Sequence, residues 1–168
     1  MSAEDNKALV RRGIEECLNK GNLAVADELF APDFVFHTPA QPEPFRGPAG
    51  FKQYVGTIRS AFPDIHFTVH DLFSEGDRVG ARWSATLTHR GEFFGIPPTG
   101  NPAVLTGIHV YRIAGGRIAE EWQELSALRL MQDLGVLPPV EKMPKPVLKV
   151  LMKLQKLTMG KPKPAAGR

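Results

Sequence analysis

The chain has 168 residues, a net charge of +3, 42% hydrophobic residues and a single cysteine, Cys17. This length suits one domain with its own core and excludes a second catalytic domain. One cysteine excludes a disulfide framework or a cysteine-based zinc site within the chain. The sequence contains neither a run of about 18 apolar residues nor a signal-peptide pattern, so we expect a soluble, cytoplasmic protein.

The charge is divided unevenly along the chain. Residues 141–168 hold eight Lys or Arg and one Glu, a net +7, so residues 1–140 carry −4. An acidic domain argues against nucleic-acid binding, because contact with phosphates needs basic residues on the folded surface. We therefore predict a domain over residues 1–140, a basic extension over residues 141–168, and no nucleic-acid partner.

The first 61 residues show mainly helical periodicity, interrupted by one short alternating segment and a Pro-rich loop. Ser2 is suited to cap the first helix, and Pro48 suits the first turn of the last one. The predicted elements are a helix from Ser2 to Gly21, a helix from Asn22 to Phe30, a strand over residues 33–37, a loop from Thr38 to Gly47, and a helix from Pro48 to Ala61.

From Ile65 onward the pattern changes to alternating or continuous apolar residues, which indicates strands. The predicted strands cover residues 65–73, 78–90, 102–114 and 117–126, with turns at Glu75-Gly76-Asp77 and Ala114-Gly115-Gly116. Helices followed by an antiparallel meander predict an α+β fold with the helices on one face of the sheet.

Residues 88–100, which read Thr-His-Arg-Gly-Glu-Phe-Phe-Gly-Ile-Pro-Pro-Thr-Gly, are too rich in Gly and Pro for a helix or a strand ladder. The Pro-Pro pair fixes two φ angles, and Gly95 and Gly100 permit positive φ. We therefore expect a rigid, specifically shaped hairpin tip, with His89 bracing its base.

With this tip, the segments Ala61-Phe62-Pro63-Asp64, Glu75-Gly76-Asp77, Gly116-Arg117-Ile118, Glu121-Trp122 and Gln132-Asp133-Leu134-Gly135 carry a resemblance to a known family. From about Lys7 to Gly135 the chain resembles the SnoaL-like polyketide cyclases, a branch of the NTF2-like fold. The resemblance implies an α+β cone in which N-terminal helices pack on the concave face of a curved antiparallel sheet. It also implies a homodimer and cofactor-independent polyketide (ester) cyclase chemistry on a hydrophobic, carbonyl-rich molecule.

In that family a histidine and an aspartate lie fourteen positions apart, and the aspartate is the general acid/base of an aldol ring closure. The histidine matches His109, but the aspartate position holds Gln123, and a second acid position holds Ser126. An amide cannot take up a proton near neutral pH. Glu121 lies two residues before Gln123 and shares its strand face, so we expect His109 and Glu121 to transfer protons and Gln123 to stabilise an enolate. The alternatives are a surface or ion-paired Glu121 and a His109 that only satisfies a neighbour.

Four further residues are candidate substrate contacts: Arg82, His37, Trp83 and Tyr111. Arg82 interrupts a small, apolar strand, and its guanidinium would bind a carbonyl, carboxylate or phenolate oxygen. Its alternative is an ion pair with Asp71 or Glu121. The alternative for His37 is to anchor a loop, and the alternative for Trp83 and Trp122 is to pack on the sheet or in a dimer contact.

Metal and nucleotide cofactors are not expected. His66 and His70 are four residues apart on a strand with no third ligand near them in the sequence. The chain has no Gly-rich phosphate loop at the start of a helix and no nucleophile elbow.

Residues 147–157 form a short basic amphipathic pattern, with an apolar stripe opposed by lysines. The stripe would dock on the parent domain or a dimer mate, or the segment would contact an anionic membrane or an acidic carrier protein. Two functions stay open at this stage: an enolising cyclase or isomerase, and a non-catalytic small-molecule binding module that has lost the family's acid.

Overall fold

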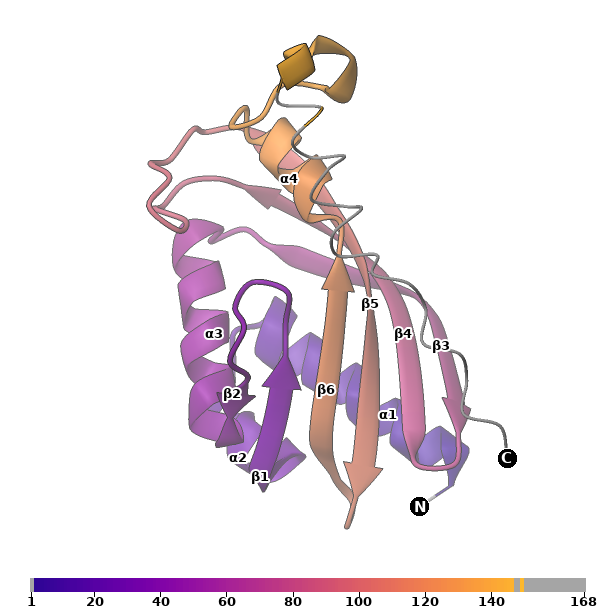
Figure 1. Cartoon of the computed structure of the whole chain (residues 1–168). Helices are drawn as coiled ribbons and strands as arrows, with labels where there is room; N and C mark the ends of the chain where they lie inside the picture. The colour runs from indigo at the N-terminus through magenta and orange to yellow at the C-terminus, as the bar shows by residue number, and fades with distance from the viewer. Residues whose placement is uncertain (1, 147–148, 150–168) are drawn as a thin grey trace, which may run out of the picture.

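The computed structural model describes residues 2–146 and 149, which form one curved sheet with helices on its inner side (Figure 1). The six strands lie in the order β2-β1-β6-β5-β4-β3. Their bounds are β1 Phe30–His37, β2 Phe45–Arg46, β3 His66–Glu75, β4 Arg78–Thr88, β5 Pro102–Ala114 and β6 Arg117–Leu125. The α+β prediction and all four C-terminal strands are confirmed.

The helices differ from the prediction mainly in type and length. Ser2 caps the first helix in a reciprocal capping box with Asp5, as its position suggested. The helix then widens into a π-helix before Gly21, whose φ of 69° ends it. The helical elements are α1 Ala3–Gly13, π-helix η1 Ile14–Asn19, 3₁₀-helix η2 Leu23–Val25, α2 Ala26–Leu29, α3 Gly47–Ala61, α4 Ala127–Asp133 and 3₁₀-helix η3 Val140–Lys142.

The sheet is mixed, and in this detail the expectation of a wholly antiparallel sheet is wrong. Strands β3 to β6 form the predicted antiparallel meander, but β1 lies parallel to β6, with Phe36 opposite Glu121. The hairpin turns in the sequence fix only the pairing of consecutive strands. Strand β1 instead joins the meander at its last strand, and the chain returns to β3 through α3.

The core lies between the inner sheet face and the helices. Inward side chains alternate along the strands, as in Val79, Ala81 and Trp83 of β4 and Leu105, His109 and Tyr111 of β5. Helices α1 and α3 cover this face. At one end of the core the helices and strands do not meet completely, and a cavity remains there.

The β4–β5 hairpin carries the long tip predicted from its Gly and Pro residues. Its base is closed by backbone hydrogen bonds between His89 and Asn101 and between Gly100 and His89. His89 is fully buried, and its Nδ1 accepts a hydrogen bond from the Thr99 backbone N–H at 3.3 Å. His89 therefore braces the turn, as expected.

The predicted amphipathic segment over residues 147–157 lies outside the described residues, and the domain boundary at residue 140 stays a prediction. Within the described range, no helix is long and apolar enough to span a membrane.

Candidate functional site

A cavity of about 230 Å³ opens between α3, the inner faces of β4 to β6, α4 and the hairpin tip. Most of its wall is apolar, and its aromatic members are Phe36, Phe51, Tyr54, Phe62, Phe67, Trp83, Phe93 and Phe94. The polar groups that line it include His109, Glu121 and Gln123. An enclosed apolar space with a few convergent polar groups is typical of small-molecule sites.

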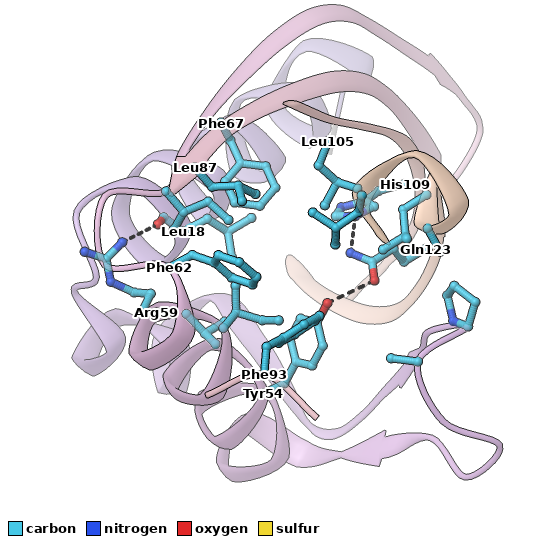
Figure 2. Close-up of a pocket in the computed structure, with 18 of the residues that line it drawn as sticks. Leu18, Tyr54, Arg59, Phe62, Phe67, Leu87, Phe93, Leu105, His109 and Gln123 are labelled. Carbon is cyan, nitrogen blue, oxygen red and sulfur yellow. Dashed lines mark hydrogen bonds between the residues drawn. The ribbon is translucent and has the colours of Figure 1, made fainter. Parts of the chain in front are cut away.

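His109 and Gln123 are directly opposite each other on β5 and β6, and both side chains are buried. Nε2 of Gln123 lies 2.9 Å from Nε2 of His109. Because an amide nitrogen only donates, Nε2 of His109 is the acceptor of this bond and its ring hydrogen is on Nδ1. The structure thus confirms that the two residues meet inside the domain, where Figure 2 shows Gln123 between His109 and Tyr54.

Two hydroxyl groups fix the orientation of the Gln123 amide. Its Oε1 accepts hydrogen bonds from the Thr38 hydroxyl at 2.8 Å and the Tyr54 hydroxyl at 3.1 Å. Burial raises the pKa of Tyr54 to about 12, so this phenol stays protonated and remains a donor at neutral pH. The amide oxygen is therefore occupied by two donors, and its nitrogen faces the histidine.

Glu121 and Tyr111 lie on the other side of the imidazole. Nδ1 of His109 is 2.7 Å from the Tyr111 hydroxyl and 3.1 Å from Oε1 of Glu121. Glu121 is only 3% exposed, so its surface alternative is wrong. Burial, then the negative charge of Glu121, raise the pKa of Tyr111 well above its usual value. Tyr111 does not line this cavity, so its expected position as a direct substrate contact is corrected: its hydroxyl contacts Nδ1 of His109 instead.

Trp83 lines the cavity, as expected, and its ring lies edge-to-face with His109 at 5.0 Å between centroids. The indole has room because Gly107 is opposite it on β5. A Cβ at Gly107 would lie 2.5 Å from Cζ2 of Trp83. A side chain at position 107 and this position of the indole are therefore incompatible.

Two predicted substrate contacts face away from the cavity. Arg82 is exposed on the outer sheet face, where its guanidinium pairs with Asp71. His37 stacks on Trp122 at 5.5 Å and pairs with Glu120 at 3.0 Å, also on the outer face. Both predictions are corrected for the same reason: successive strand residues point to opposite faces, and Trp83 and Phe36 take the inner positions.

Within the residues that the structure describes, no group of three or more His, Cys, Asp and Glu side chains could hold a metal ion. His66 is exposed, and Nε2 of His70 bonds to the Ser84 hydroxyl at 2.8 Å on the outer face.

Sequence reasoning missed Thr38, Tyr54 and Arg59. Tyr54 and Arg59 come from α3, and Thr38 follows β1, so no short motif joins them to His109. Nη1 of Arg59 donates to the backbone carbonyl of Leu18 at 2.9 Å, at the end of the π-helix (Figure 2). An apolar helical face interrupted by a tyrosine was the one signal for Tyr54.

The SnoaL-like polyketide cyclase family matches residues 8–134, which includes every residue of this polar cluster. The chain belongs to this family. Its fold is also that of AclR, a candidate hydroxylase from Streptomyces galilaeus, with 29% identity, a TM-score of 0.72 and coverage of 94% of this chain and 96% of that one. No curated protein sequence matches the chain.

Several of the similar solved structures carry a cyclase assignment. IdmH from Streptomyces antibioticus, a candidate polyketide cyclase, is 34% identical, with a TM-score of 0.67 and coverage of 78% of this chain and 99% of that one. A candidate polyketide cyclase from Acidithiobacillus ferrooxidans is 33% identical, with a TM-score of 0.70 and coverage of 80% and 98%.

In this SnoaL-like chain, the buried carboxylate of the cluster lies two residues before the position at which the sequence resemblance implied an acid. The amide of Gln123 takes the expected acid position, and Glu121 holds a carboxylate two residues earlier, on the Nδ1 side of His109. Ser126 bonds to Thr106 through its hydroxyl at 3.2 Å and joins α4 to β5. Ser126 is thus a structural contact in this SnoaL-like domain.

Proposed function

We propose that this protein is a cofactor-independent SnoaL-like enzyme that enolises a hydrophobic, carbonyl-rich small molecule and closes or isomerises a ring through the enolate. The observation that carries the proposal is the polar cluster in the apolar cavity. His109 has a carboxylate and a phenol on Nδ1 and an amide donor at Nε2. This arrangement supplies a base, a group that stabilises its charged form, and a donor for an oxyanion.

In the proposed first step, a substrate carbonyl oxygen takes an amide hydrogen of Gln123, which releases the Nε2 lone pair of His109. The proton of the carbon next to the carbonyl moves to Nε2, and its electron pair shifts to the oxygen to form an enolate. Glu121 stabilises the imidazolium through Nδ1. The enolate carbon then attacks a second carbonyl carbon of the same molecule, and His109 returns the proton to the new alkoxide.

The test uses 2-acetylnaphthalene, an apolar ketone with an enolisable methyl group. In D₂O, the protein should catalyse the exchange of deuterium into that methyl group. Mass spectrometry of the ketone measures the exchange rate. His109→Gln should lower the exchange rate by about 10²-fold or more, the usual contribution of a general base. Arg82→Ala, on the outer face, is the matched control and should leave the rate unchanged. An unchanged rate in His109→Gln would exclude His109 as the base.

A second function, a non-catalytic binding module, is favoured by one observation. The Nε2 lone pair of His109 is occupied by the amide of Gln123, an arrangement suited to binding a carbonyl without removing a proton. Such a module would bind 2-acetylnaphthalene but give no exchange above the buffer rate. Binding and exchange measured on the same sample separate the two functions.

We also propose a cytoplasmic homodimer that forms through the outer sheet face. Phe73, Val104 and Ile108 are exposed on this face, where soluble monomers seldom leave a large apolar patch. Ile108→Lys should convert the dimer to a monomer in light scattering, and a dimer that persists contradicts this surface. Docking of residues 147–157, or their binding to an anionic membrane or acidic carrier protein, is tested by truncation after Pro139.

A further inference from the structure

Phe94 occupies a turn that its residue type disfavours. Phe93 and Ile96 exchange backbone hydrogen bonds of 3.0 and 2.9 Å, so Phe94 and Gly95 are the two central residues of a tight turn. Both have positive φ, 49° and 77°. Asn-Gly is the preferred pair for such a turn, and a bulky residue with positive φ is an outlier. Among the described residues, Phe94 is the only one other than glycine with positive φ.

The turn is firmly attached to the rest of the domain. The backbone N–H groups of Arg90 and Gly91 both donate to the Ala61 carbonyl, at 2.9 and 3.0 Å. A Cβ at Gly91 would lie 2.2 Å from the Ser60 carbonyl oxygen, so the loop base sits directly on the end of α3. The position of Phe94 is therefore set by the fold.

The ring of Phe94 is 63% exposed although it lines the cavity. Its aromatic contact is with Phe93, at 4.6 Å between centroids. Phe73 on the outer face is exposed to the same degree, 60%, but its ring covers Gly80, where a Cβ would lie 2.1 Å from it. Phe73 thus has a packing role, whereas the packing of Phe94 accounts for neither its exposure nor its backbone conformation.

We propose that Phe94 is a ligand-contacting residue that selects for length: its ring covers the part of an elongated, flat apolar ketone that extends beyond the cavity. An apolar cavity of about 150 Å³ accommodates benzene. The 230 Å³ here suits two fused rings with the carbonyl at Gln123, and a third ring would reach the rim. Strained residues that packing does not explain concentrate at binding sites. The inference rests on the proposed function, because that function places the carbonyl.

The experiment compares 2-acetylnaphthalene with 2-acetylanthracene, which have the same acetyl group and two or three fused rings. Binding to the full chain is measured by fluorescence titration. Phe94→Asn should weaken the binding of 2-acetylanthracene about fivefold to tenfold, within the range of one lost aromatic contact, and that of 2-acetylnaphthalene less than about twofold. Because Asn suits positive φ, the melting temperature of this variant should be equal or higher, which excludes unfolding as the cause. Phe73→Asn is the matched control and should affect neither probe.

Equal affinities of Phe94→Asn and the parent for 2-acetylanthracene would overturn the inference, as would an equal loss for both probes or the same loss in Phe73→Asn. Gln123→Leu tests the proposed function separately, since it should weaken both probes equally. If Gln123→Leu changes neither probe, the carbonyl site is wrong while a length-dependent effect of Phe94 still stands. If the parent binds neither probe, both proposals fall.

Discussion

Gln123 donates an amide hydrogen to Nε2 of His109 across 2.9 Å, inside a largely apolar cavity. A donor at Nε2 and two acceptors, Tyr111 and Glu121, at Nδ1 hold this histidine, so its tautomer is fixed before a ligand arrives. A ligand oxygen that accepts the amide hydrogen of Gln123 would therefore free the Nε2 lone pair of His109. The proposed proton transfer depends on this change in the hydrogen-bond partner of Gln123.

Replacing Gln123 by Asp should raise the deuterium exchange rate of 2-acetylnaphthalene by at least about tenfold. The carboxylate adds a base at the family's acid position, and such groups contribute about 10² to 10⁴-fold. Gln123→Asn is the matched control, because asparagine has the same length as aspartate but carries no charge. If both variants exchange at the same rate, the added carboxylate does not act as a base.

Glu121→Gln should lower the same exchange rate by about tenfold or more, because the imidazolium loses the carboxylate 3.1 Å from Nδ1. Tyr111→Phe should have a smaller effect, on the maximal rate and not on the half-saturating concentration, because Tyr111 does not line the cavity. The double variant should resemble Glu121→Gln alone. Additive losses in steady-state exchange would mean that Glu121 and Tyr111 act independently of each other.

Thr38→Val and Tyr54→Phe should each lower the free energy of unfolding by about 1 kcal/mol, because Oε1 of Gln123 keeps the other hydroxyl as a donor. The double variant leaves a buried acceptor without a donor, so its loss should exceed the sum by about 1 kcal/mol or more. Denaturant unfolding measures all three. Thr57→Val on the exposed side of α3 is the control, and simple additivity would contradict the shared acceptor.

The environment of Glu120 predicts that the stability of the protein depends on pH. Partial burial opposes its ionisation, but hydrogen bonds from His37 and Arg112 prevail and lower the pKa of Glu120 below the usual 4.5. A lowered folded-state pKa stabilises the protein above the unfolded-state value, and that stability is lost as the pH falls through the folded-state value. Glu120→Gln should therefore lower the melting temperature most above about pH 5, and the difference should shrink as the pH falls through the folded-state pKa of Glu120.

The control for this prediction is Glu124→Gln, on the same strand and exposed. Its melting temperature should follow that of the parent at every pH. A difference between Glu120→Gln and the parent that persists at low pH would mean that the substitution disturbs packing and not charge.

The sequence predicted the meander from its hairpin turns, and the shared face of Glu121 and Gln123 from the period of two. The direct pairing of His109 with Gln123 also depends on a β-bulge between Arg112 and Ile113, which the turn residues do not reveal. The same period of two explains why the prediction of Arg82 as a substrate contact was wrong. Trp83 follows Arg82 directly, and two successive strand residues cannot both face one cavity. The parallel pairing of β1 with β6 depends on contacts between distant segments, which local periodicity does not contain.

Other features were beyond the reach of the sequence for different reasons. The π-helix after α1 has the same apolar spacing as an α-helix over so short a segment, and α4 has only seven residues. The contacts of Thr38 and Tyr54 with Gln123 join positions 85 and 69 residues apart, respectively. A resemblance transfers the residues of a motif, but not the groups that orient them.

The lack of a side chain at Gly107 determines where the indole of Trp83 lies in the cavity wall. The indole of Trp83 lies in the space that a Cβ would fill, 2.5 Å from its Cζ2 atom. An alanine here would meet both the indole and the Glu124 carbonyl oxygen, which would lie 2.4 Å from its Cβ, so the indole and the pairing of β5 with β6 would both have to shift. The residue at position 107 therefore determines where part of the cavity wall lies, although Gly107 does not itself line the cavity.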